Sequence, residues 1–268
     1  MTYRLLALDL DGTLLGPDLR IHPTDRQALA CLADRGVVVA IATGRMLASA
    51  RPFAAELGIE APLITYNGAW VRCTRTETDW LHHPIPPELA QEAIQALEAT
   101  GLRVNVYLND RFVITEMTPE AAAYMAHARV EPFVCHAWSN LGAFAPTKLL
   151  AIGPEERIPE LAETLSARFA GRLQVAQSMP TFLEVTHAAV NKGQALDLLC
   201  QRLGIAREEV VAVGDGLNDV EMLAWAGLGV AMGNAAPSVK KWADRVTRPV
   251  SEAGVARLVD DLIREGKV

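Results

Sequence analysis

The chain of 268 residues carries 25 lysines and arginines against 32 aspartates and glutamates, which gives a formal net charge of −7. Half of its residues are hydrophobic and 21% are charged, a composition that favours a folded protein over a disordered one. The acidic balance argues against broad nucleic-acid binding, which needs basic stripes, but is compatible with a local basic pocket for a small anion. No apolar run approaches the ~20 residues of a membrane helix, and the first residues read as a strand rather than a signal peptide. We therefore expect a cytoplasmic protein with no membrane or nucleic-acid partner.

The cysteines and histidines show no spacing typical of metal ligands. No two cysteines form a Cys-x-x-Cys pair, which argues against a zinc ribbon. We expect the thiols to be reduced and buried. The cysteines are Cys31, Cys73, Cys135 and Cys200.

The first part of the chain alternates apolar segments with helical ones. The apolar segments are almost free of polar residues, as expected of strands that are covered on both faces. Thr24 is the expected N-cap of the first helix. Strand–helix alternation of this kind predicts a parallel sheet. The expected strands are 5–8, 37–41 and 62–65, and the expected helices are 24–34 and 46–57.

The middle of the chain loses this alternation and predicts a separate α+β domain with an antiparallel sheet. Asn109 and Asp110 form a turn pair between two apolar runs, which indicates a hairpin. Residues 131–146 show no pattern that assigns them to a helix or strand. The expected strands are 102–108, 111–115, 148–152, 172–177 and 181–186, and the expected helices are 88–99, 119–127 and 155–169.

The parallel alternation resumes in the last part of the chain. We therefore predict an α/β fold: a doubly wound (Rossmann-like), mostly parallel sheet core at 1–82 and 188–268, with an α+β domain inserted at 83–187. The expected strands are 210–213, 228–231 and 245–247, and the expected helices are 192–203, 220–225 and 254–263.

Two pairs of carboxylates follow predicted strands of the core. Asp9 and Asp11 come after the first strand, and Asp215 and Asp219 come after the strand at 210–213. Ligands of open α/β sheets bind outside the strand C-termini where the strand order reverses, so Asp9 and Asp215 face each other if these two strands are neighbours. Clustered carboxylates repel unless a cation joins them, and oxygen ligands together with phosphate favour Mg²⁺.

Four segments of the sequence resemble the motifs of the haloacid dehalogenase-like (HAD) phosphohydrolases, in the order in which that family has them and in the form found in its Cof-like branch. The resemblance spans the whole predicted core, and it implies that the inserted domain is the large α/β cap of that branch. Two further strings, YNGA at 66–69 and VAMGNA at 230–235, are also Cof-like. The four motifs are LDLDGTL at 8–14, ATGR at 42–45, NKG at 191–193 and GDGLNDVEM at 214–222.

The resemblance implies a catalytic role for four residues. Asp9 is the expected nucleophile that forms an aspartyl-phosphate, and Asp11 is the expected acid and base for the leaving alcohol and the hydrolytic water. Thr43 is expected to hydrogen-bond the phosphoryl group. Lys192 is expected to pair with its charge and to keep Asp9 ionised.

The resemblance also implies a metal and substrate site. Asn218 is expected to contact the phosphate or an ordered water, Gly44 to offer a backbone N–H, and Arg45 to be a second anion contact or a surface residue. Asp219 is expected to support the metal directly or through other ligands. The expected Mg²⁺ ligands are Asp9, Asp215, Asp219 and the backbone carbonyl of Asp11.

We therefore expect a Mg²⁺-dependent phosphatase of small phosphorylated metabolites such as sugar phosphates, as a monomer or small homo-oligomer. A phosphomutase on the same core and a non-catalytic phosphometabolite-binding protein remain alternatives. Candidate substrate contacts in the cap are Tyr107, Asn109 and Arg111.

Overall fold

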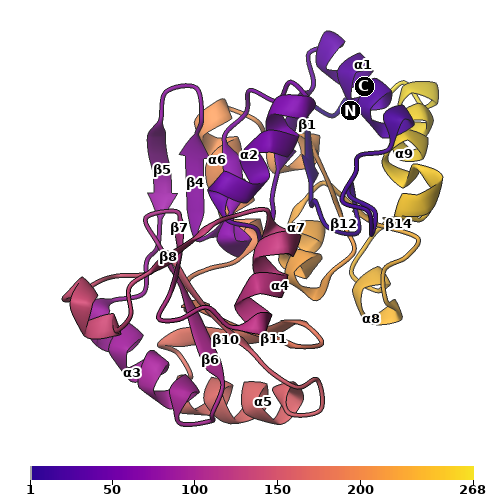
Figure 1. Cartoon of the computed structure of the whole chain (residues 1–268). Coiled ribbons are helices and arrows are strands. Elements are labelled where there is room, and N and C mark those ends of the chain that lie inside the picture. The colour runs from indigo at the N-terminus through magenta and orange to yellow at the C-terminus, as the bar shows by residue number, and fades with distance from the viewer. Residues whose placement is uncertain (1) are drawn as a thin grey trace. The chain divides into compact units, whose positions relative to one another are not determined.

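The computed structural model describes residues 2–268, except for the side chain of His127. Its residues group into two compact units (Figure 1). Unit 1 contains the chain up to Gly44 together with Ala50–Leu81 and Asn191–Val268. Unit 2 contains Arg45–Ser49 and His82–Val190. The second unit is thus mainly an insertion within the first.

Unit 1 is built on a parallel sheet with the strand order β14-β13-β12-β1-β2. β1 pairs with β12 on one side and β2 on the other, so the strands followed by Asp9 and Asp215 are neighbours and the strand order reverses at β1. Every residue of β1, β12 and β13 is buried, as strands covered on both faces require. The strands are β1 (Leu5–Leu8), β2 (Val38–Ile41), β12 (Val210–Gly214), β13 (Leu228–Ala231) and β14 (Arg245–Val246).

Helices complete unit 1, and α1 packs against α9. The prediction that Thr24 is the N-cap of α1 is wrong. The His22 side chain accepts a hydrogen bond from the Thr24 backbone N–H, so the N-cap is His22, two residues earlier. Among the described residues, no helix has the length and apolar character needed to cross a membrane. The helices are α1 (Pro23–Asp34), α2 (Leu47–Glu56), of which 47–49 lie in unit 2, α6 (Lys192–Leu203), α7 (Val220–Trp225), α8 (Pro237–Lys240) and α9 (Gly254–Arg264).

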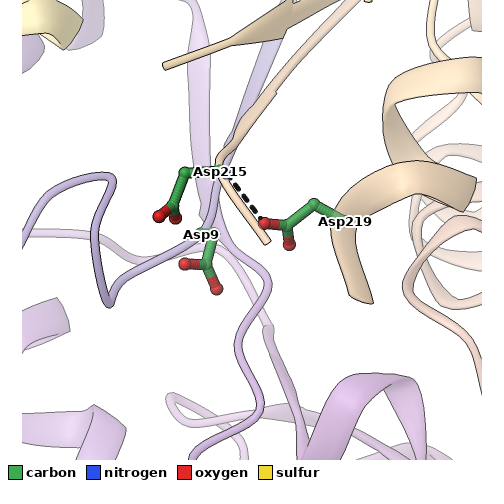
Figure 2. A group of neighbouring side chains, drawn as sticks. All are labelled: Asp9, Asp215 and Asp219. Atoms are coloured by element: carbon green, nitrogen blue, oxygen red, sulfur yellow. Dashed lines mark hydrogen bonds between the residues drawn. The ribbon is translucent and has the colours of Figure 1, made fainter. Parts of the chain in front are cut away.

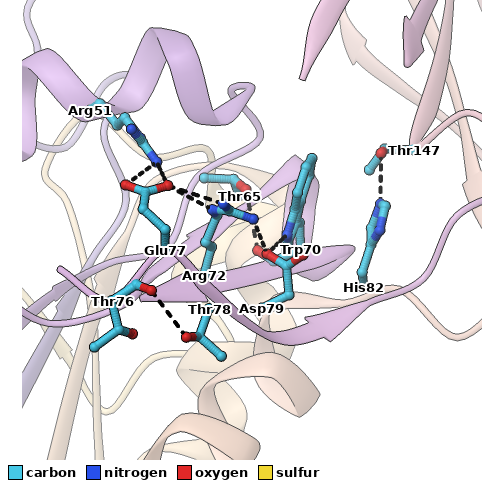
Figure 3. Close-up of polar contacts among 10 residues, drawn as sticks. All are labelled: Arg51, Thr65, Trp70, Arg72, Thr76, Glu77, Thr78, Asp79, His82 and Thr147. Atoms are coloured by element: carbon cyan, nitrogen blue, oxygen red, sulfur yellow. Dashed lines mark hydrogen bonds and ion pairs between the residues drawn. The ribbon is translucent and has the colours of Figure 1, made fainter. Parts of the chain in front are cut away.

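The expected strand 62–65 is present, but its place in the parallel sheet is wrong: a single parallel bridge, Ala42 to Ile64, links it to that sheet, and it begins a separate three-stranded sheet with an antiparallel neighbour. The other two strands of that sheet were not predicted. Polar contacts hold its two hairpin strands together: the Trp70 indole N–H and Arg72 both donate to Asp79, at 2.7 and 2.6 Å (Figure 3). Glu77 accepts from both Arg51 and Arg72. The strands are β3 (Leu63–Thr65), β4 (Trp70–Cys73) and β5 (Thr78–His82).

Unit 2 holds a six-stranded sheet in the order β10-β11-β9-β6-β7-β8, antiparallel apart from the β7–β8 pair. The turn at Asn109 and Asp110 is confirmed, with positive φ at both residues and Leu108 paired with Arg111. The strands are β6 (Arg103–Leu108), β7 (Arg111–Ile114), β8 (Pro132–Val134), β9 (Lys148–Ile152), β10 (Leu173–Met179) and β11 (Phe182–His187).

Residues of the sheet and of the helices at 87–98 and 158–168 form the hydrophobic cluster of unit 2, which includes Ile94, Val106, Leu149 and Phe169. β8 and a short 3₁₀ helix at Trp138–Leu141 occupy the stretch to which the sequence assigned no element. The helices are α3 (Pro87–Glu98), α4 (Pro119–Ala128) and α5 (Ile158–Arg168).

All four cysteines are free thiols. The expectation of burial holds for three of them and is wrong for Cys31, which is exposed on the outer side of α1.

Candidate active site

Three carboxylates converge at the C-terminal end of the central strands of unit 1. Asp9 follows β1 and donates its backbone N–H to the Val213 carbonyl at 3.0 Å, which fixes it beside β12. Asp215 follows the last residue of β12, and Asp219 lies one short turn further on. Each of the three offers an oxygen within 4.8 Å of those of the others (Figure 2). The sheet topology thus brings together residues that are some 200 positions apart in sequence.

Lys192 joins two of these carboxylates. It is the first residue of α6, whose N-cap Asn191 accepts the Gln194 N–H at 2.7 Å. The fully buried Lys192 Nζ donates to Asp9 Oδ1 and to Asp219 Oδ1, both at 2.6 Å. Burial opposes the charged amine, but the two carboxylates outweigh it and raise the Lys192 pKa, so the amine stays protonated.

Asp219 also shapes the loop that carries Asp215. Its Oδ2 accepts the backbone N–H groups of Asp215 at 3.0 Å and of Gly216 at 2.9 Å. A Cβ on Gly214 would lie 2.5 Å from the Asp219 side chain, so only glycine permits this approach. Both oxygens of Asp219 are therefore engaged by protein donors.

The carboxylate cluster is electrostatically unfavourable even with the Lys192 amine in place. Burial raises the pKa of Asp9 well above its ordinary value, and Asp219, Asp215 and Asp11 add to the effect while Lys192 opposes it. Burial, reinforced by Asp219, raises the pKa of Asp215 to about 6. A hard divalent cation with oxygen preference fits this donor set, because it supplies the positive charge that the cluster lacks.

Two polar residues that sequence reasoning did not single out hold Asp215 in place. Thr13 Oγ1 donates to Asp215 Oδ1 at 3.2 Å. Asn234 Nδ2 donates to Asp215 Oδ2 at 3.1 Å and to the Gly12 carbonyl at 2.9 Å. Thr13 lies in the first motif and Asn234 in the VAMGNA string, each shortly after a predicted strand. That position is the signal in the sequence that could have marked them as site residues.

Asp11 of the first motif follows β1, and Thr43 of the second motif follows β2. Asp11 is partly buried and close enough to raise the pKa of Asp9 and Asp215, although its side chain is not one of the three that converge. Thr43 is buried after β2 and donates its backbone N–H to the Ile64 carbonyl at 2.9 Å.

Arg45 and Asn218 have other surroundings. Arg45 belongs to unit 2, where it donates to Ser49 Oγ at 3.0 Å. Asn218 is exposed in unit 1, and its Nδ2 donates to Asn67 Oδ1 at 2.8 Å. Asn67 in turn lies against Gly44, where a Cβ would be 2.8 Å from Asn67 Oδ1.

Of the three candidate residues in unit 2, Tyr107 is fully buried and lies under the Lys148 amine, whose Nζ is 4.8 Å from the ring centroid. Arg111 stacks over the Phe133 ring at 4.7 Å. Asn109 occupies the β6–β7 turn.

Comparison with known families gives one match across almost the whole chain. The model for haloacid dehalogenase-like hydrolases matches residues 6–259. These limits include all four motif strings and the inserted unit. The match therefore covers the carboxylate cluster and its lysine together.

Individual relatives resemble the chain over most of their length. An HMP-PP phosphatase of Serratia proteamaculans is 37% identical over 242 residues, which are 89% of this chain and 86% of the relative. A 5-amino-6-(5-phospho-D-ribitylamino)uracil phosphatase of Bacillus subtilis is 33% identical, over 96% of this chain and 94% of its own. The crystal structure of a haloacid dehalogenase-like hydrolase from Bacteroides thetaiotaomicron is 28% identical and superimposes with a TM-score of 0.89, covering 97% of this chain and all of the other.

Proposed function

The chain belongs to the haloacid dehalogenase-like hydrolase family and is a phosphatase, and from this premise we propose that it hydrolyses small phosphate monoesters with Mg²⁺ through an aspartyl-phosphate at Asp9. One observation carries the proposal: a buried lysine bridges Asp9 and Asp219 beside Asp215. This arrangement offers a nucleophile, a fixed positive charge and a set of oxygen ligands at one strand edge.

The proposed reaction has two steps. In the first, an Asp9 carboxylate oxygen attacks phosphorus, the bond from phosphorus to the alcohol oxygen breaks, and Asp11 gives its proton to the leaving alcohol. In the second, Asp11 takes a proton from water, the water oxygen attacks phosphorus, and the bond from phosphorus to Asp9 breaks. Inorganic phosphate is released and both aspartates return to their starting state.

We propose that Asp9, Asp215 and the Asp11 carbonyl hold the Mg²⁺, and that Asp219 supports them by fixing the Asp215 loop and Lys192. When bound there, the ion would supply positive charge that offsets the phosphoryl charge, so that the Asp9 carboxylate could approach phosphorus. Lys192 adds a second positive charge near Asp9. Thr43, Gly44, Asn218 and Arg45 remain the proposed phosphoryl contacts.

The two relatives with named substrates act on HMP-PP and on a phosphoribitylamino-uracil, which are small phosphorylated metabolites. We propose a substrate of the same class for this chain, with sugar phosphates included, and no nucleic-acid or membrane partner. We also propose that the inserted residues 83–187 form the cap that selects among substrates, with Asn109 and Arg111 as exposed candidates.

A phosphate-release screen tests the proposed function. Purified protein is incubated with p-nitrophenyl phosphate and a panel of phosphorylated metabolites, with Mg²⁺ and with excess EDTA. Turnover with Mg²⁺ supports a hydrolase. Transfer of phosphate between positions of one sugar, without release, would instead identify a phosphomutase. Tight binding of a metabolite with no chemistry would identify a phosphometabolite-binding protein.

A further inference from the structure

The turn between β3 and β4 has an unusual backbone conformation. Tyr66, Asn67 and Gly68 have φ values of 52°, 59° and 101°, so three successive residues are left-handed. The left-handed backbone conformation is unfavourable for residues with a Cβ, and asparagine tolerates it better than most. The surrounding structure must therefore hold the loop in this shape.

The loop contacts the motif that follows β2. The Asn67 backbone N–H donates to the Thr43 carbonyl at 3.0 Å. The Asn67 side-chain oxygen lies so close to Gly44 that a Cβ at that position would be only 2.8 Å from it. A larger residue at position 44 would push the Asn67 amide out of place.

The same loop contacts the other two motifs of unit 1 that follow it in sequence. Asn218 Nδ2 donates to Asn67 Oδ1 at 2.8 Å. A Cβ on Gly68 would lie 2.4 Å from the carbonyl oxygen of Asn191, the N-cap residue that directly precedes Lys192. One three-residue loop is thus fitted against the segments that carry Thr43, Lys192 and Asn218.

The far side of the loop is fixed to its own sheet. Tyr66 is fully buried and stacks on Trp70, with ring centroids 6.2 Å apart. Thr65 Oγ1 donates to the Trp70 carbonyl at 3.2 Å, and Trp70 is held in turn by Asp79 (Figure 3). The loop therefore has a rigid support on one side and three motif segments on the other.

We propose that Asn67 is a positioning residue for phosphoryl transfer: its side-chain oxygen fixes the rotation of the Asn218 amide. An amide group has two N–H donors, and once one is bound to Asn67 the direction of the other is set. The inference rests on the proposed function, in which Asn218 contacts the phosphoryl group. A donor that is fixed before reaction stabilises developing charge better than one that rotates freely.

Asn67→Gly is the informative substitution. Glycine accepts the left-handed backbone, so the change removes the amide and leaves the loop conformation accessible. We expect kcat to fall about tenfold to a hundredfold, with KM within about twofold, because positioning acts on the transition state. The loss should be equal for p-nitrophenyl phosphate and a sugar phosphate, since the phosphoryl group is common to both. His136→Gly, at an exposed left-handed position of unit 2, is the matched control and should keep wild-type kinetics.

A double-mutant cycle separates positioning from a general structural effect. If Asn67 acts through Asn218, then Asn67→Gly combined with Asn218→Ala loses no more activity than Asn218→Ala alone. Thermal unfolding midpoints of the single variants should match that of the wild type. Multiplicative losses in the double variant, or wild-type kcat in Asn67→Gly, would overturn the inference.

Orthovanadate binding, measured by titration calorimetry with Mg²⁺ present, keeps the inference separate from the proposed function. Absence of wild-type turnover would contradict the proposed function alone. In that case a weaker vanadate affinity in Asn67→Gly than in His136→Gly would still support the positioning role. Equal affinities in these two variants would overturn it.

Discussion

At the scale of single residues, the site depends on one buried amine shared by two carboxylates. Replacing Lys192 with methionine keeps the approximate volume but leaves Asp9 and Asp219 buried without their partner. We expect the free energy of unfolding to fall by about 3–5 kcal/mol, as measured by urea denaturation. Arg248→Met, which breaks an exposed single-contact pair with Glu252, is the control and should cost about 1 kcal/mol or less. Equal losses in the two variants would contradict a special role for the buried pair.

The two leading aspartates should respond differently to loss of charge. Asp9→Asn is nearly isosteric but removes the nucleophile, so we expect no measurable turnover from a folded protein. Asp11→Asn should reduce kcat by about 10²–10⁴, the usual contribution of a general acid–base group. Steady-state kinetics with p-nitrophenyl phosphate measure both, and Asp34→Asn at the exposed end of α1 serves as the unaffected control. Wild-type activity in Asp9→Asn would remove the covalent mechanism.

The residues that converge at the site were predictable where they stand in recognisable motifs at strand ends. Asp9, Asp215 and Asp219 do converge, and Lys192 lies between two of them. Thr13, Asn234 and Asn67 were not predicted as site residues, because their contacts depend on how distant loops approach one another. A polar residue in a turn has the same local signature whether it only shapes the turn or orients a neighbour.

At the scale of elements, a buried carboxylate connects α1 to α9. Asp25 is fully buried, and its Oδ1 accepts the Ala256 N–H at 2.7 Å in the first turn of α9. Its Oδ2 has no hydrogen-bond partner among the described residues. Burial raises the Asp25 pKa, although the Ala256 hydrogen bond and His22 oppose the rise.

This raised pKa predicts a pH dependence with a definite sign. Between the unfolded pKa, about 3.9, and the higher folded pKa, the folded chain holds a proton that the unfolded chain has lost. The contribution of Asp25 to stability is therefore largest at low pH and decreases as pH rises through this window. Urea denaturation of the wild type and Asp25→Asn from about pH 4 to 7 measures it. The stability difference, wild type minus variant, should fall as pH rises, and a constant or rising difference would contradict the account.

Helices and strands with a regular pattern of apolar residues were predictable, and short strands that mix polar and apolar residues without a pattern were not. Continuously apolar strands and glycine-terminated helices of unit 1 lie close to their expected bounds, as at β1, β13 and α6. β5 was missed because Thr78–His82 is an edge strand with polar, exposed positions that give no clear alternation. β8 is three residues long and begins with proline, so it carries almost no strand signal.

At the scale of the whole molecule, the fold class and the family were predictable from the order of the motifs along the chain. The match over residues 6–259 and the parallel sheet of unit 1 confirm both predictions. The order of the motifs does not identify the substrate, because these motifs act on the phosphoryl group, which every substrate has.

Metal dependence should be coupled to pH across the whole enzyme. Mg²⁺ must displace a proton from Asp215, because burial raises the pKa of that carboxyl to about 6. We expect EDTA to stop turnover and Mg²⁺ to restore it, with Ca²⁺ a poor substitute because it prefers more ligands and a looser geometry. The Mg²⁺ concentration for half-maximal rate should rise as pH falls below about 6. A pH-independent requirement, or full activity in EDTA with metal absence shown by elemental analysis, would contradict this prediction.

The central claim is that Asp9 carries the phosphoryl group during turnover, and trapping that group tests it most directly. The Asp11→Asn variant lacks the base for the second step, and p-nitrophenyl phosphate has a leaving group that needs no acid in the first. The intermediate should therefore accumulate when this variant is mixed with p-nitrophenyl phosphate and Mg²⁺ and quenched in acid. Peptide mass spectrometry should then find one hydroxylamine-sensitive phosphoryl group on Asp9, and none in a variant that also carries Asp9→Asn. Substrate turnover by Asp11→Asn with no phosphoryl group on Asp9 at any quench time would contradict the claim.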